Sequence, residues 1–183
     1  MYSIDELPLQ DLQNFWSLLY MDFCRKICTN HPAEGETVIR RAIAETGRRQ
    51  GEWQRQEHEQ IGLNTNLHSF FLDGRGAVCD PRSAAAVHTR NTEVCLWDRY
   101  ICPMANYWAA HSAEAYGLFY CEEYMRAFLS GYTGGKGQFH LSKVLTDKRD
   151  ILCQFAAYFR PANLELEQRR KAFESTPVRQ EAP

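Results

Sequence analysis

QFHLSKVLTDKRDILCQFAAYF, at residues 138–159, has the pattern of a β-hairpin. Apolar and polar residues alternate from Gln138 to Leu145, and Ile151 to Phe159 is an apolar run. The charged segment between them, Thr146 to Asp150, is typical of a turn. We therefore predict two neighbouring antiparallel strands in this part of the chain.

A further strand is expected upstream, at Asn91 to Ile101, where the residues also alternate. Glu93, Cys95, Trp97 and Arg99 would share one face of it. Apolar residues at spacings of three and four predict helices before and after this strand. Their expected ranges are Leu9 to Asn30, Glu34 to Gln60, Met104 to Tyr116 and Leu118 to Ser130. This order predicts an α+β fold, an antiparallel β-sheet packed by several α-helices.

Glycines mark three places where the backbone is expected to have a special role. Gly47 and Gly51, four apart in one expected helix, predict that another element approaches closely. Gly117 is expected to end the helix that precedes it. The segment Gly131 to Gly137 holds four glycines, and we expect it to be a flexible loop that acts as a lid.

The composition is that of an ordinary globular protein, with 44% hydrophobic and 24% charged residues. A net charge of −2 gives no basic excess, so we expect no nucleic-acid partner. No apolar stretch reaches the roughly 20 residues of a membrane span, and residues 1–10 have no signal core. We therefore expect a cytoplasmic protein with no membrane association. A single domain over residues 1–183, with a polar tail at 163–183, fits this length.

Seven cysteines are spread along the chain without a CxxC pair. An odd number at wide spacing does not indicate a disulfide framework, so we expect free thiols. Cys24 and Cys28, four apart on one helix, are expected to pack in the core. Of Cys95, Cys121 and Cys153, at most one is expected at the surface, and no disulfide should join them.

Three segments within residues 93–155 read EVCLWDRY, AYGLFYCEEYMRAFLSGY and SKVLTDKRDILCQF. Together with ETGRRQGEW in the preceding helix, they resemble the L-2-amino-thiazoline-4-carboxylic acid hydrolase family over about residues 35–160. The matching positions are Cys95, Gly117, Cys121, Lys143, Asp150, Cys153 and Phe155. The chain departs from the family at Tyr124, where an aspartate is usual, and at Lys148 and Arg149, where a glycine is usual.

The resemblance implies a small-molecule enzyme that opens a C–N or C–S bond of a cyclic, amidine-like substrate. The family is similar to vinyl-4-reductase-type ligand-binding domains, which often dimerise, so a homodimer is one implied arrangement. Those domains can hold zinc through clustered cysteines. The matching second cysteine near Cys153 is missing here, so no cofactor is expected, with zinc as the alternative. Two other functions stay open: a natural-product tailoring enzyme that cyclises or rearranges its substrate, and a non-catalytic small-molecule-binding or sensor domain.

Opening such a ring requires a nucleophile or an activated water, a proton donor and an anchor for the substrate carboxylate. Cys121, in the matched motif, is the candidate nucleophile, and a buried structural cysteine is its alternative. Glu123 is the candidate base for a water mechanism, unless it is simply an exposed helix residue. His140, on a polar strand face, is the candidate proton carrier or else faces solvent.

The strand at residues 91–101 supplies most of the candidate substrate-binding residues. Arg99 could pair with the substrate carboxylate through two parallel hydrogen bonds, and a surface arginine is the alternative. Cys95 and Trp97 share its strand face. Tyr124, at the position where the family usually has an aspartate, completes the expected binding set.

Overall fold

The computed structural model describes residues 7–71, 84–147 and 149–160. Within these ranges the elements are α1 (Leu7–Asn30), α2 (Gly35–Gln60), α3 (Leu67–Phe70), β1 (Ala84–Arg90), β2 (Val94–Ile101), α4 (Pro103–Ala110), α5 (Glu114–Tyr132), β3 (Gln138–Lys143) and β4 (Cys153–Tyr158). The fold is α+β, as predicted. The polar tail at 163–183 and Cys79 lie outside the described residues. None of the described helices is both long and apolar enough to span a membrane.

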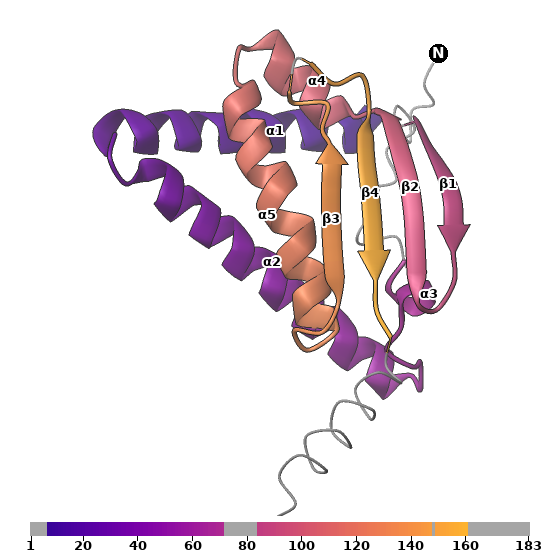
Figure 1. Cartoon of the computed structure of the whole chain (residues 1–183). Coiled ribbons are helices and arrows are strands. Elements are labelled where there is room, and N and C mark those ends of the chain that lie inside the picture. Colours follow the sequence, from indigo (N-terminus) through magenta and orange to yellow (C-terminus); the bar gives the residue numbers. More distant parts are fainter. Residues whose placement is uncertain (1–6, 72–83, 148, 161–183) are drawn as a thin grey trace, which may run out of the picture.

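The four described strands form one antiparallel sheet in the order β1-β2-β4-β3 (Figure 1). β3 and β4 are the predicted hairpin, and β2 is the predicted upstream strand. β2 pairs with β4 so that Cys95 lies opposite Ala157, and Arg99 lies opposite Cys153. The sequence pattern does not reveal β1, because its first three residues are alanines without alternation.

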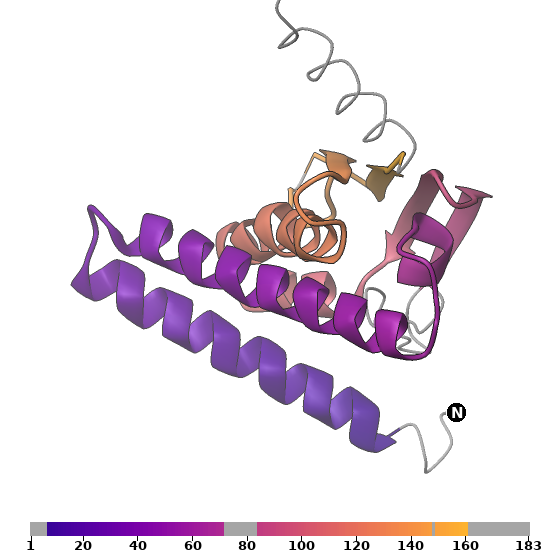
Figure 2. The ribbon, with the colours of Figure 1, turned by 90° about the horizontal axis from the view of Figure 1, so that it is seen from below.

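The described helices lie on one side of the sheet, with α5 and the short α3 next to it and α2 and α1 farther out (Figure 2). α5 packs on the sheet through Phe128, Leu129 and Tyr132, which are fully buried. Their partners in this core include Trp97 of β2 and Phe139 of β3. The apolar face of α5 therefore fixes the distance between the helices and the inner face of the sheet.

Glycines let α2 and α5 cross in close contact, as predicted. A Cβ atom at Gly47 would lie 2.6 Å from the carbonyl oxygen of Tyr124. A Cβ at Gly51 would overlap the carbonyl oxygen of Phe128, and one at Gly131 would overlap that of Arg48. Real Cβ atoms do not approach this closely, so a larger residue at these positions would force the two helices apart.

The boundary between α4 and α5 differs from the prediction. The break lies at residues 111–113, where Ser112 has a φ of 51°, and Gly117 lies inside α5 instead of ending a helix. A Cβ at Gly117 would overlap the Trp108 ring and lie 2.8 Å from the Thr146 methyl group. A larger side chain would not fit here, so packing requires a glycine inside the helix. In the sequence, such a glycine cannot be distinguished from one that ends a helix.

The glycine-rich segment begins inside α5 and continues as a hydrogen-bonded turn. Gly131 and Tyr132 belong to α5. The Thr133 hydroxyl donates to the carbonyl oxygen of Leu129 at 2.7 Å and accepts from the amide of Gly137 at 2.7 Å. Gly134 and Gly135 supply the positive φ angles of the turn. None of residues 131–137 lines either cavity described below, so this segment is not placed as a lid over them.

Candidate functional site

A cavity of about 260 Å³ lies between the inner face of the sheet and the helices α4 and α5. Strand alternation turns Cys95, Trp97 and Arg99 of β2 toward it, and β4 adds Cys153 and Phe155. The residues that α5 contributes are Tyr120, Cys121, Tyr124 and Met125. Cys102, in the connection from β2 to α4, is the fourth cysteine in its wall. We call this space the thiol cavity.

The four predicted substrate-binding residues, Cys95, Trp97, Arg99 and Tyr124, all line the thiol cavity together with Cys121. Sequence reasoning gave no role in the site to Cys102 or to Phe155. Cross-strand pairing explains why Phe155 lines the cavity, because Phe155 lies opposite Trp97 in the register of β2 and β4. That register follows from the folded sheet and is not visible in the sequence.

Aromatic rings give the thiol cavity one apolar wall. The rings of Trp97 and Phe155 are stacked, with centroids 4.8 Å apart and an angle of 11° between planes. Phe71 meets the Trp97 ring edge-on at 5.0 Å. Aromatic side chains of this kind favour an apolar, unsaturated or aromatic ring in a ligand.

Arg90 of β1 lines this largely apolar space, and Arg99 brings a second positive charge to it. Its side chain lines the thiol cavity, and its buried Nε has no hydrogen-bond partner among the described residues. An unsatisfied buried donor costs about 1–3 kcal/mol, and an anionic ligand would remove that cost. A carboxylate matches a guanidinium in shape and charge and can accept two parallel hydrogen bonds from it.

Cys95, Cys121 and Cys153 are free thiols, and their burial favours the protonated form. No disulfide joins the described cysteines, and Cys95 and Cys153 are buried while Cys121 is partly buried, as predicted. Burial raises the pKa of Cys95 to about 11 and that of Cys153 to about 11. The pKa of Cys121 is raised further, by burial first and then by Cys102 and Cys153 beside it. The Arg99 charge acts in the opposite direction on Cys121.

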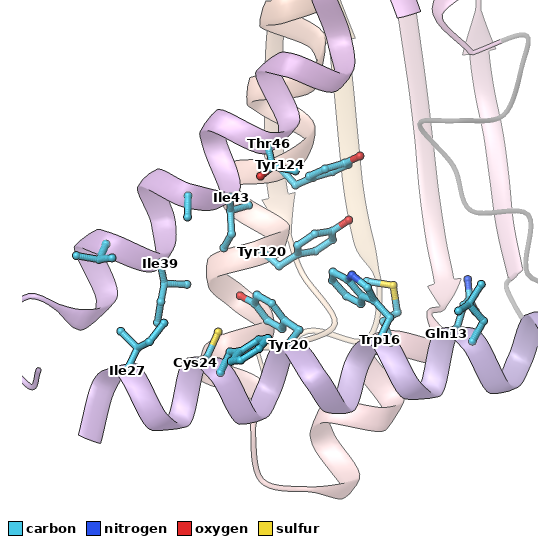
Figure 3. Close-up of a pocket in the computed structure, with 15 residues that line it drawn as sticks. Gln13, Trp16, Tyr20, Cys24, Ile27, Ile39, Ile43, Thr46, Tyr120 and Tyr124 are labelled. Atoms are coloured by element: carbon cyan, nitrogen blue, oxygen red, sulfur yellow. The ribbon is translucent and has the colours of Figure 1, made fainter. Parts of the chain in front are cut away.

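A larger groove of about 710 Å³ lies between α1 and α2, with Tyr120 and Tyr124 of α5 at its base (Figure 3). Trp16, Tyr20 and Cys24 point into it from α1. Ile39, Ile43 and Thr46 line it from α2. We call this space the helix groove. It shares Gln13, Met104, Tyr120 and Tyr124 with the thiol cavity.

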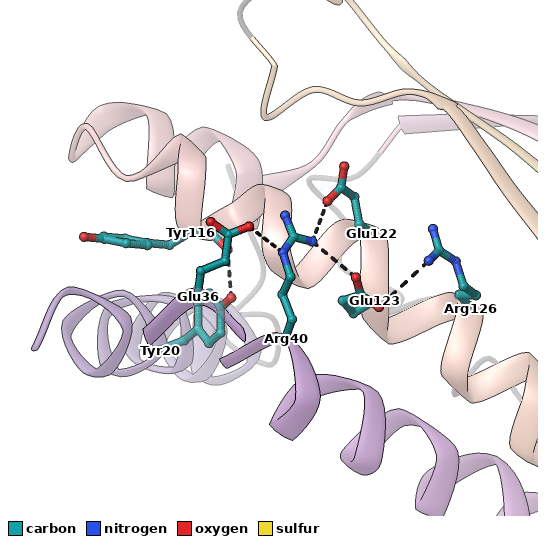
Figure 4. A network of polar contacts seen from close by, with 7 residues as sticks. All are labelled: Tyr20, Glu36, Arg40, Tyr116, Glu122, Glu123 and Arg126. Atoms are coloured by element: carbon teal, nitrogen blue, oxygen red, sulfur yellow. Dashed lines mark hydrogen bonds and ion pairs between the residues drawn. The ribbon is translucent and has the colours of Figure 1, made fainter. Parts of the chain in front are cut away.

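Glu123 belongs to a separate polar network on the other side of α5 (Figure 4). The Arg40 guanidinium donates to Glu122 at 2.6 Å and to Glu123 at 3.2 Å. Arg126 lies 3.9 Å from the second oxygen of Glu123. Helix positions two apart point about 200° away from each other, so Cys121 and Glu123 face opposite ways. Glu123 does not line the thiol cavity.

His140 is exposed on β3, where its ring lies 5.9 Å from that of Tyr158. Its neighbour Phe139 is buried in the core below the sheet, so strand alternation turns His140 to the opposite face. The structure thus brings Cys121 together with Arg99 but not with Glu123 or His140. The described residues that line the thiol cavity include no Asp, Glu or His.

The described residues contain no group of three or more His, Cys, Asp or Glu arranged to hold a metal ion. Comparison of the chain with models of protein families, with curated proteins and with solved structures finds no match.

Proposed function

We propose that the protein is a small-molecule enzyme that binds a flat, cyclic carboxylate in the thiol cavity and opens a C–N or C–S bond of its ring. The observation that carries this proposal is the presence of Arg99 and Cys121 in one apolar cavity. Arg99 would hold the carboxylate, and the wall formed by Trp97 and Phe155 would support the ring. The sequence resemblance to aminothiazoline carboxylate hydrolases supports the same class of substrate.

The chemistry follows from the protonated state of Cys121. Because burial raises the pKa of this thiol, it would attack as a neutral group and must lose its proton during the attack. A cyclic amidine carries its own base. The sulfur would form a bond to the amidine carbon, the C=N electron pair would move to nitrogen, and that nitrogen would take the thiol proton. The lone pair of an amidine nitrogen then re-forms a C=N bond as the ring C–N or C–S bond breaks, and the leaving nitrogen or sulfur takes the proton that this nitrogen gives up. Water then adds to the same carbon and displaces the cysteine sulfur, which regains its proton from that water.

Turnover of 2-amino-thiazoline-4-carboxylate by purified variants tests this proposal. Cys121→Ser should lose at least about 100-fold in turnover while still binding the substrate, since the hydroxyl is a far weaker nucleophile. Cys28→Ser is the matched control, because Cys28 packs between α1 and α2 outside the thiol cavity. Normal turnover in a folded Cys121→Ser protein would show that Cys121 is not the nucleophile.

A second candidate function is carboxylate binding without catalysis. The observation that favours it is the lack of Asp, Glu and His among the described lining residues, which leaves no side-chain base in the cavity. Arg99-dependent binding of cyclic carboxylates, without turnover of any cyclic amidine, would support this function over the enzyme.

A further inference from the structure

The helix groove is large, apolar and open to solvent at its rim. Leu12 of α1 is 62% exposed, Phe23 of the same helix is 61% exposed and Val38 of α2 is 50% exposed. All three line the groove. Soluble proteins rarely leave a contiguous apolar surface of this kind uncovered unless something binds there.

The groove and the thiol cavity meet at a shared wall. Tyr120 and Tyr124 line both spaces, and their rings are stacked with centroids 4.9 Å apart. Gln13 of α1 and Met104 of α4 also line both. A ligand that leaves the thiol cavity past these four side chains would enter the groove between α1 and α2 (Figure 3).

The two volumes suit different parts of one ligand. The thiol cavity, at about 260 Å³, is smaller than the roughly 300–1,000 Å³ of most ligand pockets and suits a single small ring. The helix groove, at about 710 Å³, falls within that range but brings no Arg or Lys to hold an anion. The charged anchor therefore lies in one space and most of the volume in the other.

We propose that the thiol cavity and the helix groove form one elongated site for an amphipathic substrate. Its cyclic carboxylate head binds at Arg99, and an extended apolar arm leaves past Tyr120 and Tyr124 and lies between α1 and α2. This inference rests on the proposed function, because it takes the anion at Arg99 as the head. The two spaces are neighbours that share four lining side chains, and this favours the arm over a second copy of the chain as the occupant of the groove.

The length of the arm should then determine affinity. Thiophene-2-carboxylate serves as the head alone, and its 5-ethyl, 5-butyl and 5-hexyl derivatives add the arm. Each methylene buried in the groove should tighten binding by up to about fourfold, as measured by isothermal titration calorimetry. Arg99→Gln should weaken the whole series by a similar factor, because every member shares the carboxylate.

Ala42→Trp is the variant that tests the groove itself. Ala42 is exposed on α2 and lines the groove, so an indole there fills space without disturbing the core. All members of the thiophene-2-carboxylate series should bind this variant with the same affinity. Thr37→Trp is the matched control, because Thr37 is exposed on the same helix but does not line the groove, and it should keep the gain with chain length.

The outcomes separate this inference from the proposed function. If the parent ring binds through Arg99 but the longer arms bring no gain, or if Ala42→Trp keeps the gain, the elongated site is wrong and the proposed function stands. If the parent ring does not bind in an Arg99-dependent way, the proposed function fails and the inference fails with it. Light scattering on the same samples measures the oligomeric state and tests whether a second copy of the chain occupies the groove. A dimer that Ala42→Trp converts to a monomer, with no gain from the arm, would make the groove a subunit interface and overturn the inference.

Discussion

The raised pKa values of Cys95 and Cys153 predict how stability depends on pH. Burial raises both thiol pKa values from about 9 to about 11. The folded state therefore holds these two protons more tightly than the unfolded state. The resulting stabilisation is fully present below about pH 9 and is lost as the pH rises through about 11. At pH 9.5 the loss is about 0.8 kcal/mol per thiol, or about 1.6 kcal/mol for the pair.

Urea unfolding at pH 7.0 and pH 9.5 measures this loss. The free energy of unfolding of the wild type should fall by about 1.6 kcal/mol more between these pH values than that of the Cys95→Ala/Cys153→Ala double variant. With the urea dependence of a small domain, this difference moves the midpoint by roughly 0.5–1.6 M. Val144→Ala is the control, because it truncates another buried side chain that does not titrate.

The comparison between proteins isolates the two thiols. Buried tyrosines, whose pKa values are also raised, contribute to the pH dependence of all three proteins alike. Val144→Ala should lower stability at both pH values and keep the pH dependence of the wild type. The same pH dependence in the wild type and in the double variant would refute the reasoning, because it would show that Cys95 and Cys153 titrate as exposed thiols.

Three further predictions concern the helix crossing and the side chains that lie away from the thiol cavity. Gly51→Ala should lower the free energy of unfolding by about 1–3 kcal/mol in urea, because its Cβ would push α2 away from α5; unchanged stability would contradict the close crossing. Glu123→Gln should change the affinity for thiophene-2-carboxylate by less than about twofold in calorimetry, since Arg40 holds this carboxylate on the other side of α5. His140→Gln should keep turnover of 2-amino-thiazoline-4-carboxylate, and a large loss of rate would mean that His140 reaches the substrate after all.

The sequence predicted the elements with strong periodicity and missed those without it. The hairpin of β3 and β4 and the long helix α2 are found close to their expected bounds, because alternation and helical spacing are local properties. β1 shows no such pattern. Gly117 was assigned to a helix end because a glycine forced by tertiary packing looks the same in sequence as a helix end.

Part of the candidate site was predicted. The residues that were grouped correctly are related by local strand geometry, and the others depend on helix geometry or on packing. Cys95, Trp97 and Arg99 share a strand face, so period-two alternation was enough to group them. Glu123 follows Cys121 by two residues, and proximity in the sequence suggested a shared site that helical geometry does not allow. His140 lies on the outer face of the sheet, and only the packing of Phe139 against the helices decides which face that is.

In the proposed enzyme, the charge balance of the thiol cavity would connect substrate binding to the protonation state of Cys121. The Arg99 charge lowers the pKa of this thiol, against the larger effect of burial. A carboxylate bound to Arg99 would neutralise that charge, so it would make the thiolate less favourable still. A substrate that offered only a carboxylate would therefore leave Cys121 inert. A substrate that also brings a basic amidine nitrogen supplies the proton acceptor that the described lining residues do not provide, and this requirement would separate substrates from ligands that merely bind.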